Sequence, residues 1–254
     1  MPVHLFGLCA DMDTLRGVLP DGIFVIEDAA CAAGAAYKDR PAGSLGDMGC
    51  FSFHPRKIIT TGEGGMLTTD DAGLAEQAKV LRNHGASVPE ELRHSGIEPY
   101  ILPEFDVMGF NYRMSDVQGA LGVAQLGKLD GFIGERERWA RWYREQLSDI
   151  GWLKAPFFPD GHDHSWQSFV TVVDPKTAPM SRNDIMKHFH ARDIQTRPGT
   201  HAISELGYYK NRYNLKSADF PHARMLHHNA LALPLHNRMV EDDFVSVMEV
   251  IREL

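Results

Sequence analysis

One lysine-bearing stretch, residues 49–65, constrains this chain more than any other feature of its sequence. Alternating aromatic and small residues from Gly49 to Phe53 predict a buried strand, which ends at Pro55 and is followed by Lys57 and a glycine-rich turn. The pattern delivers one amine to the end of a strand. A mostly apolar setting disfavours the charged form of such an amine, and the neutral form is the one that a Schiff-base lysine needs.

A second apolar run lies upstream, from Phe24 to Ala30, and ends in acidic and small residues. Because Asp28 lies near its end, we expect its carboxylate at the carboxyl edge of an open α/β sheet, where ligands usually bind. A lysine for an aldehyde and an aspartate for a pyridinium nitrogen are the two groups that pyridoxal phosphate chemistry most needs. Ser52, five residues before Lys57, offers a hydroxyl that can donate to the cofactor phosphate.

Each of these residues has an ordinary structural interpretation when it is taken alone. A lysine after a strand is usually a solvated turn residue, and an aspartate there more often caps a helix or forms a turn. Gly62, Gly64 and Gly65 are by themselves tight-turn residues. The combination is what favours a cofactor site.

Taken together, the motifs resemble one enzyme family. The chain is similar, over essentially its whole length, to the DegT/DnrJ/EryC1/StrS family of sugar aminotransferases. The stretches that carry the resemblance are Glu27-Asp28-Ala29-Ala30, Gly43-Ser44-Leu45-Gly46-Asp47, Phe51-Ser52-Phe53-His54-Pro55-Arg56-Lys57, Thr61-Gly62-Glu63-Gly64-Gly65, Arg82-Asn83-His84-Gly85, Gly109-Phe110-Asn111-Tyr112-Arg113-Met114-Ser115 and Arg197-Pro198-Gly199-Thr200-His201-Ala202.

The resemblance implies pyridoxal 5'-phosphate as the cofactor and gives roles to four residues. Lys57 matches the catalytic lysine that binds the cofactor aldehyde, and it would also serve as general acid and base. Asp28 matches the partner of the ring nitrogen, and Ser52 a phosphate ligand. Asn111 matches an asparagine that reaches the cofactor phosphate of the neighbouring subunit, which implies a homodimer with shared active sites.

The implied reaction moves an amino group from glutamate or glutamine to a keto group on a nucleotide-linked sugar, for polysaccharide, lipopolysaccharide or antibiotic sugars. His201 and Arg197 are candidates to line the site, and their ordinary interpretation is as loop residues. The alternative is a non-catalytic remnant or regulatory protein that keeps the fold only. The related sugar dehydratases replace the lysine with histidine, so Lys57 disfavours them.

Three departures from the family pattern stand out. Cys31 occupies a position where glutamine or histidine usually faces the cofactor hydroxyl, and Ser204 one where many members repeat a histidine. Family members also carry a longer N-terminal part, with a helix start that binds the phosphate and an aromatic that stacks on the ring. We therefore expect an N-terminally truncated chain, with uncovered sheet edge and marginal stability.

The order of predicted elements favours an α/β fold. Strands are expected at Val3–Phe6, 24–28 and 66–69, with helices from Asp11 and over 74–81, which implies a mostly parallel sheet. By resemblance this is the type I PLP-transferase fold. Residues 1–128 are then the remnant of a PLP-binding large domain, and 129–254 a linking helix and a small C-terminal α+β domain.

The second half of the chain alternates between helix and strand signals. A capping-box pattern at Ser115 opens a helix, and a longer periodic run follows a break near Gly127. Strands are expected at 169–173 and 194–197, a helix after Ser181 and a final helix over 241–254. A loop is expected over 85–110, where three prolines fall.

Composition excludes several classes of function. A formal charge of −8 and a pI near 5.9, with no basic run, argue against a nucleic-acid binder. No stretch predicts a membrane span or a signal peptide, so we expect a soluble cytoplasmic protein. The histidine pairs are one or two residues apart, which does not place two rings on one helix face, and we predict no metal site.

Overall fold

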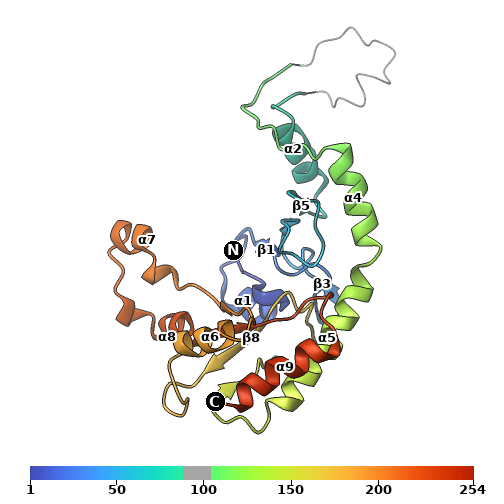
Figure 1. Ribbon diagram of the computed structural model, residues 1–254. Coiled ribbons are helices and arrows are strands. Elements are labelled where there is room, and N and C mark those ends of the chain that lie inside the picture. The colour runs from blue at the N-terminus through green and yellow to red at the C-terminus, as the bar shows by residue number, and fades with distance from the viewer. Residues whose placement is uncertain (88–103) are drawn as a thin grey trace. The chain divides into compact units, whose positions relative to one another are not determined.

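The computed structural model describes residues 1–87 and 104–254, and these form two compact units (Figure 1). The first unit comprises Met1–Leu5 and Cys9–Leu129, and the second Phe6–Leu8 and Asp130–Leu254. Each unit is described by itself below. Most of the loop that the sequence predicts over 85–110 lies outside the described residues.

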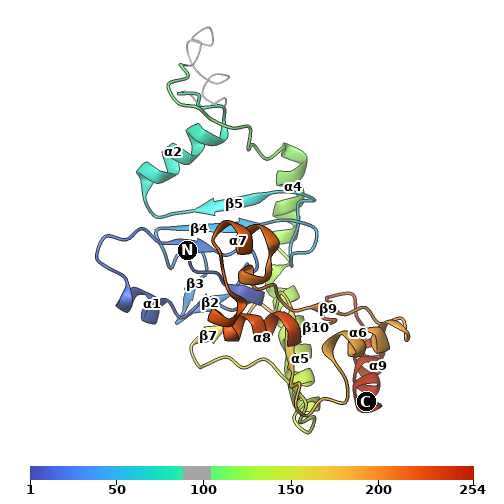
Figure 2. The ribbon, with the colours of Figure 1, turned by 90° about the vertical axis from the view of Figure 1, so that its left-hand side faces the viewer.

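A three-stranded sheet organises the first unit. The strand β1 (Ile26–Asp28) pairs in parallel with β4 (Met48–Ser52), and β4 pairs antiparallel with β5 (Gly65–Thr68), which runs beside it in Figure 2. The register places Asp28 opposite Cys50. A hairpin of β2 (Ala36–Tyr37) and β3 (Arg40–Pro41) lies between β1 and β4 in the sequence.

The prediction of a strand over Val3–Phe6 is wrong. Val3 makes one parallel bridge to Asp28, and a 3-10 turn, η1 (Leu5–Gly7), follows at once. Phe6 has a φ of 62° and Gly7 a φ of 99°, so the backbone leaves the extended region after His4. The predicted extended run is therefore reduced to a short flank of β1.

Three helices of the first unit begin at side-chain caps. They are α1 (Met12–Val18), α2 (Ala72–Arg82) and α4 (Asp116–Leu126). Asp11 and Asp71 accept backbone N–H bonds at the starts of α1 and α2. At α4, Ser115 and Gln118 form the reciprocal capping box that the sequence predicts. Ala29, Met12 and Leu45 belong to the buried core of this unit.

An antiparallel sheet organises the second unit. Its strand order is β6 (Leu153–Lys154), β8 (Phe169–Val173), β10 (Ala230–Leu233) and β9 (Arg197–Pro198). The short strand β7 (His162–Asp163) lies between β6 and β8 in the sequence. The prediction of a strand at 169–173 is confirmed. The strand expected at 194–197 begins only at Arg197, after a turn in which Asp193 has a φ of 58°.

Helices cover the core of the second unit. The two longest helices are α5 (Leu129–Gln146) and α9 (Glu241–Arg252), and the shorter ones are α6 (Arg182–His190), η2 (Ile203–Glu205), α7 (Gly207–Arg212), η3 (Ser217–Asp219) and α8 (Pro221–Asn229). In Figure 1, α9 runs beside α5. There Trp139 stacks on Phe244 with ring centroids 4.0 Å apart, and Tyr143 donates to the carbonyl of Pro234.

Two buried polar side chains lie in this second core. The guanidinium of Arg136 donates to the carbonyls of Trp166 and Leu235, and burial lowers its pKa to about 10. The ring of His164 stacks on Trp166 with centroids 4.0 Å apart, and burial lowers the pKa of His164 to about 4. Both groups are held by contacts within the unit.

Across the described ranges, no helix is both long enough and apolar enough to cross a membrane.

Candidate active site

The carboxyl ends of two neighbouring parallel strands bring the predicted residues to one edge of the first sheet. Asp28 ends β1 and Ser52 ends β4, and the strands pair directly. The backbone N–H of Ala29 donates to the carbonyl of Cys50 at 2.9 Å, which holds the two ends together. Because the strands run in parallel, Asp28 and the chain leading to Lys57 leave the sheet on the same side.

The loop that carries Lys57 is closed at its base. The carbonyl of Phe53 accepts from the backbone N–H of Thr61 at 3.1 Å and from the hydroxyl of Thr60 at 2.8 Å. Inside the loop, the N–H of Lys57 donates to the carbonyl of His54 in a tight turn that contains Pro55. The two residues that follow Lys57, both isoleucines, are buried and anchor the turn. The backbone of Lys57 is therefore fixed on both sides.

The side chain of Lys57 is half-buried and contacts the segment that follows Asp28. Its Nζ lies 3.1 Å from Sγ of Cys31. No other hydrogen bond or ion pair reaches this amine from the part of the chain that the structure describes. Cys31 therefore faces the lysine for which the sequence predicts a catalytic role, a contact that sequence reasoning did not find.

Asp28 and Ser52 retain hydrogen-bonding capacity at the same edge. Oδ1 of Asp28 accepts from the N–H of Ala30 at 3.1 Å, while Oδ2 makes no hydrogen bond within the described chain. Oγ of Ser52 accepts from the N–H of His54 at 3.3 Å, which leaves its own proton free to donate. Both residues are half-buried. The edge thus offers an amine, a carboxylate oxygen and a hydroxyl proton.

This donor set fits pyridoxal phosphate. The aldehyde needs an amine, the protonated ring nitrogen needs a carboxylate and the phosphate needs donors, and one residue of each kind lies at this edge. Groups of three or more histidine, cysteine, aspartate or glutamate side chains that could hold a metal ion are absent from the two described ranges. The amine, the carboxylate and the hydroxyl at this edge match the groups that an aldehyde-bearing cofactor with a phosphate needs.

Asn111 makes its hydrogen bonds with residues other than Lys57, Asp28 and Ser52. It makes a bridge with Asn83, and its Oδ1 accepts from Nε of Arg113 at 3.1 Å. Arg113 also donates to Oδ1 of Asn83, so the three side chains form one polar group. Among residues 1–87 and 104–254, no hydrogen bond joins Asn111 to Lys57, Asp28 or Ser52.

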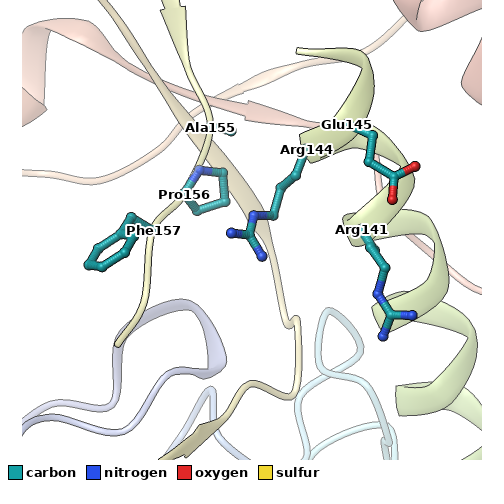
Figure 3. A pocket seen from close by; sticks show the side chains of 6 residues that line it. All are labelled: Arg141, Arg144, Glu145, Ala155, Pro156 and Phe157. Atoms are coloured by element: carbon teal, nitrogen blue, oxygen red, sulfur yellow. The ribbon is translucent and has the colours of Figure 1, made fainter. Parts of the chain in front are cut away.

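The other candidate residues belong to the second unit. Arg197 is exposed on β9, and the ring of His201 lies 5.9 Å from that of His227. Ser204 is buried. One open pocket of this unit, about 460 Å³ in volume, is lined by three residues of α5 and three of the segment after β6 (Figure 3). None of the residues predicted for the site lines this pocket.

Sequence reasoning did not assign a role to Glu27, the neighbour of Asp28. Its side chain is fully buried and accepts four hydrogen bonds, from His4, Gly43, Leu45 and Gly46. Burial alone would raise its pKa, but these bonds together lower the pKa below its ordinary value. The acidic pair before the small residues is the only sequence signal that could have drawn attention to it.

A comparison with family models decides the family. The model described as the DegT/DnrJ/EryC1/StrS aminotransferase family matches residues 1–252. The chain belongs to this family. Its fold is accordingly a partial type I PLP-transferase fold of mixed α/β class, as the sequence predicts.

Two curated relatives match this chain over its whole length. The chain is 38% identical to the spore coat polysaccharide biosynthesis protein SpsC of Bacillus subtilis, over all of its own length and 66% of the relative. It is 35% identical to GDP-perosamine synthase of Caulobacter vibrioides, covering 100% of itself and 65% of the relative. The chain thus spans a little less than two thirds of the length of these relatives.

A solved structure is similar to this fold over almost the whole chain. DesV of S. venezuelae superimposes with a TM-score of 0.86 at 28% identity, covering 99% of this chain and 63% of the other. Similarity of this kind supports the fold and leaves the roles of individual residues as predictions.

Proposed function

We propose that this chain carries the catalytic lysine of a PLP-dependent sugar aminotransferase, which moves an amino group from glutamate or glutamine to a nucleotide-linked keto-sugar. The observation that carries the proposal is that Asp28 and Ser52 end the paired strands β1 and β4, while the amine of Lys57 contacts Cys31, which follows Asp28 closely. Family membership over residues 1–252 supports the reaction class.

The residues have distinct tasks in this proposal. When bound, pyridoxal phosphate supplies an aldehyde and an electron-accepting ring. Lys57 would hold the aldehyde of the cofactor through Nζ and, as general base, would take a proton from the donor's Cα. Asp28 keeps the ring nitrogen protonated through Oδ2, the oxygen without a hydrogen bond in the described chain. Ser52 donates its hydroxyl proton to the phosphate.

The sugar substrate is proposed from the relatives. One relative is named a GDP-perosamine synthase and another a spore coat polysaccharide biosynthesis protein, so a nucleotide-linked sugar is the substrate class we test first. The donor rests on the family resemblance alone.

We further propose a homodimer with shared active sites. Asn111 is engaged with Arg113 and Asn83 rather than with the Lys57 edge, as expected of a residue that serves a neighbouring subunit. The helix α4, only a few residues further on, exposes Val117, Val123 and Leu126 and has no buried residue. An apolar helix face of this kind is typical of a protein interface.

The experiment that tests the function follows the two halves of the reaction. The chain is incubated with pyridoxal phosphate and then with glutamate or glutamine, and the absorption of the cofactor is recorded. A loss of the lysine-bound absorption with release of keto acid supports the proposal. Adding a nucleotide-linked keto-sugar should restore the absorption and yield the amino sugar by mass spectrometry. No change with either donor favours the non-catalytic alternative.

A further inference from the structure

We propose that Glu27 is a positioning residue that fixes Asp28 at the cofactor site from the opposite face of β1. The inference rests on the proposed function, because it takes Asp28 as the partner of the cofactor ring nitrogen. Adjacent residues of a strand face opposite sides of the sheet, so Glu27 and Asp28 point away from each other. Glu27 therefore acts through the backbone and not by touching the cofactor.

Every contact to the Glu27 carboxylate comes from a donor. Oε1 accepts from the backbone N–H groups of Leu45 at 2.7 Å and Gly46 at 2.6 Å. Oε2 accepts from the N–H of Gly43 at 2.7 Å and lies 2.8 Å from Nε2 of His4. Because Nδ1 of His4 accepts from the N–H of Ala10, its ring proton lies on Nε2 and points at Glu27.

The carboxylate joins the two segments that flank Asp28. On one side, the N–H of Asp28 donates to the carbonyl of Pro2 at 2.8 Å, and its carbonyl accepts from the N–H of His4 at 3.0 Å. The His4 side chain ties this flanking segment to Glu27. The position of the Asp28 backbone therefore depends on a segment that Glu27 holds in place.

On the other side, the turn held by Glu27 packs against β4. A Cβ placed on Gly49 would lie 2.3 Å from Cα of Gly43, so the turn and the strand touch at the backbone. The same strand leads to Ser52 and then to the Lys57 loop. Glu27 thus sets the spacing between Asp28 and the rest of the proposed site.

Burying the Glu27 carboxylate costs free energy unless hydrogen-bond donors satisfy it. Glu27 is fully buried, and an apolar residue in its place would leave the four donors without partners. A glutamine is a sharper change, because it has the same shape but can accept on one side only. Its amide N–H groups would face two N–H donors whichever way it turned.

The test compares Glu27→Gln with Met12→Ala, which removes a buried apolar side chain from the same unit and leaves the Glu27 contacts intact. Hydrogen exchange without cofactor is measured over residues 24–32 and 41–48. We expect Glu27→Gln to speed exchange there roughly tenfold or more, since buried donors lose their acceptor. In Met12→Ala, the ratio of the exchange rates in these segments to those in the rest of the first unit should equal the wild-type ratio.

The second readout is the cofactor itself. With pyridoxal phosphate labelled with ¹⁵N in the ring, wild type and Met12→Ala should give the signal of a protonated nitrogen at neutral pH. Glu27→Gln should shift the ring-nitrogen signal towards that of the unprotonated form. It should also weaken cofactor binding roughly tenfold, because Asp28 would no longer be held in place as the charge partner of the ring nitrogen. If Glu27→Gln does not fold, His4→Leu, which removes a single side-chain donor, should give the same changes in smaller measure.

The outcomes separate the two claims. A wild-type chain without cofactor on Lys57 overturns the proposed function. A wild type that carries the cofactor on Lys57, with exchange and ¹⁵N signal in the folded variants equal to those of wild type, overturns the role of Glu27 alone. Changes confined to Glu27→Gln and His4→Leu, and absent from Met12→Ala, support it.

Discussion

Nζ of Lys57 and Sγ of Cys31 lie 3.1 Å apart, within reach of a hydrogen bond that involves sulfur. The two residues are 26 positions apart in the sequence and meet because their strands end at the same edge. We expect this contact to orient the amine on which the proposed reaction depends.

We therefore predict that Cys31→Ala slows the glutamate half-reaction by roughly fivefold, the effect of about 1 kcal/mol from one hydrogen bond. Cys31→Ser keeps a partner for the amine and should retain most of the rate. Cys50→Ser, which alters an exposed thiol, is the control. Single-turnover absorption measurements give the rates, and equal rates in Cys31→Ala and wild type would contradict the role.

Lys57→Ala should abolish transamination. Lys57 is the only amine at this edge within residues 1–87 and 104–254, so the loss should exceed that of any other single substitution there. Lys38→Ala is the matched control, since Lys38 is an exposed lysine of the same unit that pairs with Asp13. Product formation is followed by mass spectrometry. An active Lys57→Ala variant would rule out the site.

Gly49→Ala should destabilise the first unit by about 2 kcal/mol, because the new methyl meets the backbone of Gly43 and cannot be accommodated by a rotamer change. Gly17→Ala provides the contrast. Gly17 lies inside α1 with nothing near its missing Cβ, so alanine there should stabilise by about 0.5 kcal/mol. Urea unfolding measures both, and a neutral Gly49→Ala would contradict the described packing.

The stability of the second unit should fall as the pH drops from 7 to 4. The pKa of His164 is about 4 in the folded state, where burial disfavours the charged ring, against an ordinary value of 6.5. Between these values the unfolded state binds more protons, so stability is lost as the pH falls, by up to about 3 kcal/mol. His164→Phe keeps a ring against Trp166 but cannot titrate. Its unfolding free energy should change less over this range than that of wild type, and parallel profiles would contradict the prediction.

Local signals made much of the fold predictable. The capping box at Ser115 and the apolar strand over 169–173 depend on neighbours in sequence, and both are confirmed. The prediction of a strand over Val3–Phe6 is wrong because Phe6 adopts a left-handed conformation. No residue type at that position predicts such a conformation. Short-range patterns therefore predict which elements form, but they do not predict the residue at which each strand ends.

For the site, the sequence placed Asp28 and Lys57 at strand ends, and parallel pairing of β1 and β4 brings those ends together. The contacts that were not predicted are long-range. Cys31 contacts Lys57, and Glu27 accepts hydrogen bonds from His4 and from the turn at 43–46. Such contacts follow from tertiary packing, so periodicity cannot indicate them.

The measurement that tests the central claim most directly is a trapping experiment. The purified chain is mixed with pyridoxal phosphate, reduced with borohydride and digested, and the modified peptide is mapped by mass spectrometry. The account predicts a pyridoxyl group on Lys57, absent from Lys57→Ala. No adduct, or labels scattered over exposed lysines such as Lys38, would contradict it.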